Sequence, residues 1–154
     1  MRKFQEVNTR FIKHPDVPTN LPVRGTKYSA GYDFSTKTLI RLPQFKVVTV
    51  WTDVKVYTNC DEYLQIQIRS SLGKAGIIIA NAPGVIDHDY ADNQQTGGNI
   101  GIMLINIAQP EGINLAAGER IAQGIFQRYA LTDDDGSRGE LGKRTGGYGS
   151  TGRV

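Results

Sequence analysis

The chain has few of the residues on which several kinds of protein depend. One cysteine, Cys60, occurs in 154 residues, so no intrachain disulfide can form and a reducing compartment is favoured. The two histidines, His14 and His88, show no spacing typical of a protein-built zinc site. Residues 1–14 contain no apolar signal-peptide core, and no stretch reaches the length of a membrane span. We therefore expect a cytoplasmic protein in which Cys60 is a small, buried or half-buried hydrophobe.

A strong excess of charge of one sign is also missing. The 18 Lys and Arg residues exceed the 15 Asp and Glu residues by a net charge of +3, without a basic run interleaved with aromatic residues. This charge suits an anionic small molecule and is too weak to predict nucleic-acid binding. The apolar fraction of 39% and the length are typical of one globular domain with a hydrophobic core.

The most frequent pattern in the sequence is an alternation of apolar and polar residues with a period of two. In "YLQIQIRS", residues 63–70, the side chains of Leu64, Ile66 and Ile68 are predicted to lie on one face of a strand. Clusters of Gly, Pro, Asn and Asp separate such runs and predict turns. Many short strands with frequent turns indicate an all-β sandwich or barrel. Other runs rich in β-branched residues are 46–58, 76–81 and 100–109.

Two segments depart from the plain strand pattern. Residues 119–128, "ERIAQGIFQR", fit a helix or a strand equally well, because Gly124 and its β-branched neighbours weaken the helical reading. Residues 132–154 are polar and crowded with glycine, and we expect them to form a flexible tail after a β domain at 1–131. Within that tail, "GGYGSTG" at 146–152 is of a type that can wrap phosphates with backbone N–H groups.

Three polar groups are candidates for chemistry, and each has an ordinary structural alternative. Residues 69–71, "RSS", combine a guanidinium with two hydroxyls, which suits a phosphate clamp or a solvated strand end. Asp33 lies between apolar neighbours and fits a site residue or a turn. Asp87 follows Val85 and Ile86 and fits a general base or a turn cap.

If the strand through Ile86 continued with regular alternation, Asp87 would share a face with Val85 and Ala91, opposite Tyr90. A carboxylate at the mouth of an apolar strand requires compensation, because removing its charge from water costs free energy.

Five segments occur in an order and at spacings that together resemble one family. They are "AGYDFS" (30–35), "RSSLGKAGI" (69–77), "NAPGVIDHDY" (81–90), "GERIAQ" (118–123) and "GGYGSTG" (146–152). The set resembles the motifs of the trimeric deoxyuridine triphosphate nucleotidohydrolases, the dUTPases, and it extends from about residue 29 to residue 152.

The resemblance implies a distorted jelly-roll subunit of the β-clip type that assembles as a homotrimer. The tail would close over a neighbouring active site. The implied reaction is hydrolysis of dUTP to dUMP and pyrophosphate, assisted by Mg²⁺ on the phosphates. This reaction would keep uracil out of DNA and supply dUMP for dTMP synthesis. Neither a membrane nor a nucleic acid is an expected partner.

The resemblance also assigns roles to residues. Asp87 matches the acid that activates water for attack on the α-phosphorus, Tyr90 matches the residue beneath the deoxyribose, and Asp33 matches an acid near the water shell of the metal. Arg120 is expected to make structural ion pairs. The substrate-binding residues implied in the β domain are Arg69, Ser70, Ser71, Asn81, Gly84, Val85, Ile86, Gly101 and Gln123. Those implied in the tail are Lys143, Arg144, Tyr148, Gly149, Ser150 and Thr151.

The chain departs from the family pattern at three places. A polar insertion, 91–98, stands where the family has Arg-Gly, so the usual arginine of that motif has no clear counterpart. The loop "LGKAGI" after Arg69 is one residue shorter than in some members. The tail motif lacks its usual first arginine, and Lys143, Arg144 or Arg138 is the candidate cation for the γ-phosphate.

Two other functions compete with this interpretation. A dCTP deaminase shares the fold and the "RSS" signature, but it needs a catalytic glutamate, and no Glu lies between Glu62 and Glu111. A binding or regulatory module without catalysis would not need the water-activating acid, so Asp87 disfavours it. An assay of ammonia release from dCTP separates the first rival from a dUTPase.

Overall fold

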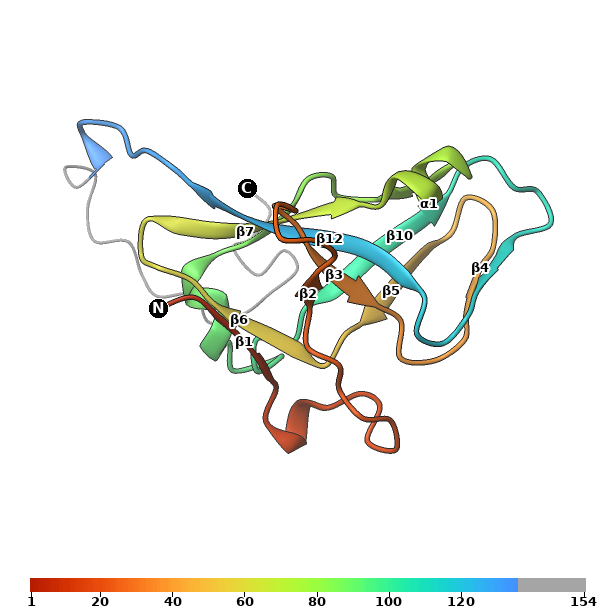
Figure 1. Ribbon diagram of the computed structural model, residues 1–154, viewed down its shortest axis with the longest axis horizontal. Coiled ribbons are helices and arrows are strands. Elements are labelled where there is room, and N and C mark those ends of the chain that lie inside the picture. Colours follow the sequence, from red (N-terminus) through yellow and green to blue (C-terminus); the bar gives the residue numbers. More distant parts are fainter. Residues whose placement is uncertain (136–154) are drawn as a thin grey trace.

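Strands make up almost all of the regular structure, as Figure 1 shows. The structure, a computed structural model, describes residues 1–135. The predicted all-β class is confirmed: the described part contains one short α-helix, α1 (Ser70–Lys74), and two 3₁₀ helices, η1 (Thr9–Phe11) and η2 (His88–Asp92). None of these helices is long and apolar enough to cross a bilayer. The predicted boundary between 1–131 and 132–154 stays a prediction, because most of that tail lies outside the described residues.

The largest sheet has five antiparallel strands and joins segments that are far apart in the sequence. Its two longest strands pair with each other. One contains Gln123, and the other ends one residue before Arg69. The strand order is β2 (Val23–Arg24), β3 (Tyr32–Ser35), β12 (Arg120–Arg128), β7 (Glu62–Ile68) and β9 (Gly84–Ile86).

Three smaller antiparallel sheets complete the distorted jelly roll. The three-stranded sheet carries the strand that follows Tyr90 and residues 91–98. Its order is β5 (Val47–Trp51), β10 (Gly101–Asn106) and β8 (Ile77–Ile79), and the two-stranded sheets are β1 (Lys3–Glu6) with β6 (Val54–Tyr57) and β4 (Ile40–Leu42) with β11 (Ile113–Leu115).

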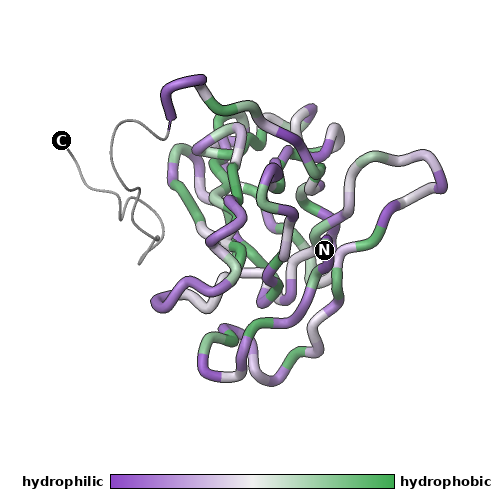
Figure 2. Tube along the Cα trace, turned by 90° about the vertical axis from the view of Figure 1, so that its left-hand side faces the viewer, coloured by the Kyte–Doolittle hydropathy of each residue, from purple (hydrophilic) through white to green (hydrophobic). Residues whose placement is uncertain are grey.

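The hydrophobic core lies between these sheets and follows from the alternation in the strands. Leu64 and Ile66 of β7 are 0% and 3% exposed, as predicted, and Ile68 packs against the same core. In β10 the buried positions are Ile102, Leu104 and Asn106, with half-buried residues between them. In Figure 2 hydrophobic and hydrophilic residues alternate at short intervals along the strands.

The ambiguous segment 119–128 is a strand, and it contains an irregularity. The pairing of β12 with β3 shifts between Arg120 and Ala122, so Ile121 is an extra residue and both Ile121 and Ala122 are buried. Because of this bulge, Arg120 lies opposite Ser35 and Gln123 lies opposite Asp33. The bulge therefore brings Arg120 and Gln123, three positions apart, to the same side of the sheet.

Two local expectations need correction or refinement. Cys60 was expected to be buried or half-buried, but it is exposed, because it lies in the turn between β6 and β7 rather than in a strand. Residues 69–71 do follow a strand, yet β7 ends at Ile68 and Ser70 begins α1. The turn therefore displays the two serine side chains at a strand-to-helix junction.

Candidate functional site

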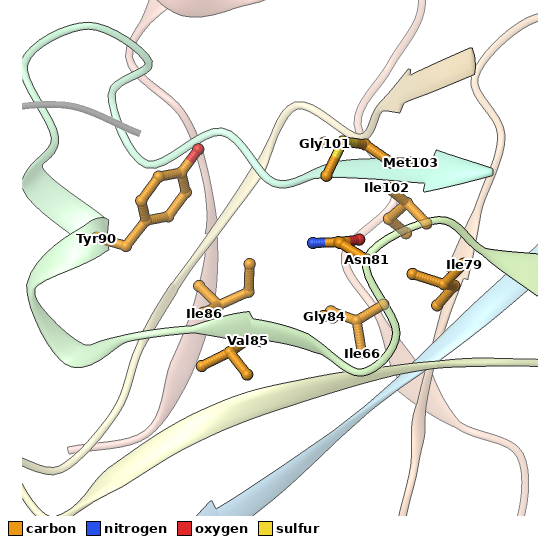
Figure 3. A pocket seen from close by; sticks show the side chains of 10 residues that line it. All are labelled: Ile66, Ile79, Asn81, Gly84, Val85, Ile86, Tyr90, Gly101, Ile102 and Met103. Atoms are coloured by element: carbon orange, nitrogen blue, oxygen red, sulfur yellow. The ribbon is translucent and has the colours of Figure 1, made fainter. Parts of the chain in front are cut away.

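An apolar cavity lies where two sheets separate. Strand β8 pairs with β10, whereas β9 pairs with β7, so the turn at 80–83 carries the chain from one sheet to the other. Strand β8 contacts β10 only from Leu104 to Asn106, and the beginning of β10 faces the resulting space. The cavity of ≈ 370 Å³ is lined by Ile66, Ile79, Asn81, Gly84, Val85, Ile86, Tyr90, Gly101, Ile102 and Met103 (Figure 3).

The apolar cavity brings together several residues of the third motif, namely Asn81, Gly84, Val85, Ile86 and Tyr90. Asn81 projects into the middle of the group, and Tyr90 stands at one end of it (Figure 3). Ile86 and Val85 project to opposite sides of β9, as a strand requires. Aliphatic walls with one amide and one tyrosine suit a flat, mostly apolar ligand of which a few polar atoms are recognised.

Asp87 lies at the end of the β9 wall and is half-buried. The expected strand alternation does not extend through it, because β9 ends at Ile86 and Asp87 is the N-cap of η2. The backbone N–H of Tyr90 donates to the Asp87 carbonyl at 3.1 Å, and the turn buries Tyr90 and Ala91 in succession. The predicted common face of Asp87, Val85 and Ala91 is therefore wrong. Asp87 is adjacent to the cavity lining and is not part of it.

A buried polar network supports the cavity behind Tyr90. The Tyr90 hydroxyl donates to the Asn99 carbonyl at 2.8 Å, and the Asn99 side chain donates to Asp53 Oδ1 at 2.9 Å. Asp53 is 0% exposed, and its Oδ2 lies 3.3 Å from Lys37 Nζ and 2.9 Å from His14 Nδ1. Burial raises the pKa of Asp53, but the hydrogen bonds from Lys13 N–H, Asn99 and His14, with the Lys37 charge, lower it overall.

A polar cavity of ≈ 410 Å³ lies at the β3–β12–β7 part of the five-stranded sheet. It collects Arg69, Ser70 and Ser71 from the second motif, Asp33 from the first and Gln123 from the fourth. Two positively charged side chains and several hydroxyl and amide groups suit a ligand with several anionic oxygens. The lining residues are Gly25, Thr26, Ser29, Gly31, Asp33, Arg69, Ser70, Ser71, Arg120 and Gln123.

Asp33 organises the two cations of the polar cavity. Arg69 Nε lies 3.3 Å from Asp33 Oδ1, and Arg120 Nη1 donates to Asp33 Oδ2 at 3.0 Å. Asp33 is 13% exposed, whereas Arg69 and Arg120 are 29% and 53% exposed. The expected ion pair of Arg120 is therefore confirmed, and one carboxylate holds both guanidinium groups at the cavity.

The remaining side chains of the polar cavity are placed by the backbone. Ser70 and Ser71 are exposed, and their hydroxyls have no hydrogen-bond partner within residues 1–135. Gln123 packs over Gly31 so closely that a Cβ at Gly31 would lie 2.4 Å from Gln123 Oε1. Glycine at position 31 therefore lets the glutamine side chain lie across β3.

The carboxylates of the described part do not form a metal cage. No group of three or more His, Cys, Asp or Glu side chains there could hold an ion. Asp33 already faces two guanidinium groups, so it suits an outer contact through water better than direct coordination. This donor set fits a Mg²⁺ ion that takes most of its ligands from phosphates and water.

The two cavities have no lining residue in common. The predicted β-domain residues other than Asp87 all line one cavity or the other, and the predicted tail residues Lys143, Arg144, Tyr148, Gly149, Ser150 and Thr151 lie outside the described residues. Sequence reasoning missed Gly31 and Arg120 as cavity residues and missed Asn99 behind Tyr90. For Arg120 a signal existed, because it lies three residues before Gln123, but the bulge that aligns them has no clear sequence pattern.

Comparison with known proteins gives one consistent family. A family model described as dUTPase matches residues 18–152. The deoxyuridine 5'-triphosphate nucleotidohydrolase of Lactococcus lactis is 34% identical over 141 residues, which cover 91% of this chain and 93% of that protein.

Solved structures agree with that family. The crystal structure of the dUTPase from Streptococcus mutans is similar with a TM-score of 0.73 and 33% identity, and the match covers 84% of this chain and 98% of that one. A variant dUTPase from phage phi11 of S. aureus, described with a structural Mg(II) ion, has a TM-score of 0.67 at 18% identity. That match covers 86% of this chain and 94% of the phage chain and supports the fold alone.

Proposed function

The chain belongs to the dUTPase family, and on this premise we propose that it hydrolyses dUTP to dUMP and pyrophosphate with Asp87 as the base that activates water. The observation that carries the proposal is the position of Asp87, where the β9 wall of the apolar cavity ends. A nucleoside in that cavity would direct its 5'-phosphates out past this carboxylate. The activity would keep uracil out of DNA and supply dUMP, and the expected location is the cytoplasm.

The apolar cavity is proposed to hold the deoxyuridine. Asn81 and the backbone of Gly84, Val85, Ile86 and Gly101 would read the uracil edge, because strands present donors and acceptors in a fixed order. The Tyr90 ring would pack beneath the deoxyribose and leave no room for a 2'-hydroxyl. Selection of the sugar is then largely steric.

In the chemical step, Asp87 accepts a proton from a water molecule, and the oxygen of that water forms a bond to the α-phosphorus. The bond from the α-phosphorus to the bridging oxygen breaks, and pyrophosphate leaves with both electrons of that bond. Arg69, Ser70, Ser71 and Gln123 would hold the phosphates by charge and hydrogen bonds. Mg²⁺ bound to the phosphates would supply further neutralisation of negative charge, with Asp33 contacting it through water.

A homotrimer would explain why the two cavities are separate. If each interface joined the apolar cavity of one subunit to the polar cavity of the next, cyclic symmetry would create three equivalent sites. An apolar stripe crosses the three-stranded sheet and supports association, since Ile105 pairs with both Val47 and Ile78. Val47 and Ile78 are 54% and 40% exposed.

The tail is proposed to complete each site from a neighbouring subunit. Tyr148 would stack on the uracil, Gly149, Ser150 and Thr151 would contact the phosphates, and Lys143 or Arg144 would supply the γ-phosphate cation. Deletion of residues from Lys143 onward should preserve folding and strongly reduce turnover.

The deciding experiment measures the products formed from each common deoxynucleoside triphosphate and from UTP. We expect pyrophosphate and dUMP in equal amounts from dUTP, and little release from dCTP, dTTP or UTP. In ¹⁸O-labelled water the label should enter dUMP, because attack is at the α-phosphorus. Orthophosphate as product, label in pyrophosphate, or ammonia from dCTP would each contradict the proposal.

A further inference from the structure

The polar insertion, residues 91–98, is folded tightly against the domain. Gly97 and Gly98 have φ values of +62° and +77°, a backbone region that favours glycine. A Cβ at Gly97 would lie 2.1 Å from Cδ2 of Phe11, and one at Gly98 would lie 2.5 Å from the Ala91 carbonyl oxygen. The insertion therefore packs against η1 and the end of η2, which is the helix that carries Tyr90.

Asn93 gives the insertion a defined turn. Its Oδ1 accepts the backbone N–H groups of Gln95 and Thr96, both at 3.0 Å, and its carbonyl accepts the N–H of Gly97 at 2.7 Å. Asn93 is 1% exposed, so water does not compete for these bonds. The turn fixes where the Thr96 side chain points.

The Thr96 hydroxyl points at the hydroxyl of Tyr90. Thr96 Oγ1 lies 3.1 Å from the Tyr90 hydroxyl oxygen and 3.1 Å from Asn93 Oδ1. Because Asn93 Oδ1 already accepts two N–H groups, the Tyr90 oxygen is the better acceptor for the Thr96 proton. The Tyr90 proton is in turn donated to the Asn99 carbonyl at 2.8 Å.

Tyr90 is thus held from two sides at the far end of its ring, and Figure 3 shows this end directed toward the segment that enters β10. On the Asn99 side the support is deeply buried, since Asn99 Nδ2 donates to Asp53 Oδ1 at 2.9 Å and to the Phe11 carbonyl at 3.1 Å. Thr96 is half-buried and lies on the accessible side. The threonine can therefore be altered without opening the core.

We propose that Thr96, through its hydrogen bond to the Tyr90 hydroxyl, is a positioning residue that sets the selectivity of the apolar cavity for deoxyribose over ribose. The inference deepens the proposed function and rests on it. Exclusion of a 2'-hydroxyl depends on the Tyr90 ring staying within a fraction of an ångström of its place, and loss of the hydrogen bond from Thr96 removes one of the contacts that hold the ring there. Thr96 contacts Tyr90 and is not among the residues that line the apolar cavity.

The test compares Thr96→Val, which keeps the shape and removes the hydroxyl, with Thr96→Ser, which keeps the hydroxyl. The measured quantity is the ratio of kcat/KM for dUTP to kcat/KM for UTP. We expect Thr96→Val to lower this ratio about tenfold, mostly by improved use of UTP, and Thr96→Ser to retain it. Gln94→Ala is the matched control, because Gln94 is an exposed residue of the same insertion.

A double-mutant cycle shows whether the effect passes through the Tyr90 hydroxyl. Thr96→Val added to Tyr90→Phe should lower the ratio no further than Tyr90→Phe alone. Thr96→Ala repeats the test if the valine variant is thermally unstable. The inference would be overturned if the ratio were unchanged in Thr96→Val and Thr96→Ala, or if the effect of Thr96→Val were additive with that of Tyr90→Phe. Normal dUTP hydrolysis in these experiments would leave the proposed function intact. Absence of dUTP hydrolysis by the unaltered protein would instead contradict the proposed function.

Discussion

The apolar cavity and the polar cavity are built by opposite means, although both border the five-stranded sheet. The apolar cavity is walled by strands and is supported from behind by the buried Tyr90, Asn99 and Asp53 network. The polar cavity is lined by side chains at strand ends and turns, with two half-exposed or exposed arginines. The proposed function assigns selection of the ligand by shape to the first cavity and binding of the ligand by charge to the second.

Each cavity is supported by an aspartate that faces at least one cationic side chain, and burial separates the two cases. Asp53 is fully buried with His14 and Lys37, whereas Asp33 and its arginines retain access to water. A buried carboxylate cannot lose its partners without a large cost, but a solvated one can. We therefore expect Asp53 to contribute mainly to folding stability and Asp33 mainly to the placement of the two arginines.

The largest expected effect is the loss of catalysis in Asp87→Asn. The variant should bind dUTP and turn it over about 10²–10⁴-fold more slowly, because the amide cannot accept the proton from water. Single-turnover kinetics with equilibrium binding of a non-hydrolysable dUTP analogue separates the two effects. Asp92→Asn is the control, since Asp92 is an 81% exposed carboxylate on the same 3₁₀ helix. Near-normal turnover in Asp87→Asn would remove this residue from its role.

Mixed trimers test whether the two cavities of one site come from different subunits. Asp87→Asn and Arg69→Ala damage opposite cavities, so each variant alone should be nearly inactive. Co-assembled in equal amounts, they should regain about a quarter of the activity, because about one site in four pairs two intact cavities. If each site lay within a single chain, the mixture would stay as inactive as its components.

The two aspartates should differ sharply in their contribution to stability. Asp53→Asn should lower the free energy of unfolding by about 3–5 kcal/mol, because it leaves Lys37 buried without its anion. Asp33→Asn should lower it by less than about 1 kcal/mol and should instead raise the KM for dUTP, since Arg69 and Arg120 lose their common anchor. Urea denaturation and steady-state kinetics on both variants measure the contrast. Equal losses of stability in the two variants would show that burial does not distinguish Asp53 from Asp33.

The smallest effect concerns acid stability and should involve neither cavity. Hydrogen bonds from Arg2, outweighing the effect of burial, lower the pKa of Glu62 from 4.5 to about 2. Because the pKa of Glu62 is lower in the folded state, its ionised form stabilises the fold at pH values above the unfolded-state pKa of about 4.5. This stabilisation is lost as the pH falls from about 4.5 toward about 2.

The stability advantage of the unaltered protein over Arg2→Gln should therefore be constant above about pH 5 and shrink below it. Thermal denaturation across this pH range measures the advantage, and Lys46→Gln, which changes an exposed lysine, is the control. An advantage that did not decline on acidification would assign the acid sensitivity to another group.

Local sequence pattern predicted most of the strands, and the family resemblance implied most of the cavity residues. Leu64 and Ile66 face the core because alternation depends only on neighbours in the chain. The motif residues Asn81, Tyr90, Arg69 and Gln123 all line a cavity, which the family resemblance implied. The two wrong expectations have different causes. Cys60 was expected to be buried because free cysteine usually is, but it lies in a turn. The face shared by Asp87 and Val85 assumed an alternation that stops where β9 ends.

Composition and alternation over a few residues identify most strands, their apolar faces and the charged side chains, but they left residues 119–128 open between helix and strand. Asp33, Arg69 and Arg120 meet, and Thr96 contacts Tyr90, only once the chain is folded. These contacts depend on strand register, on the bulge at Ile121 and on the turn made by Asn93. Such features reflect pairing energies between distant or tightly turned segments, which no local periodicity encodes.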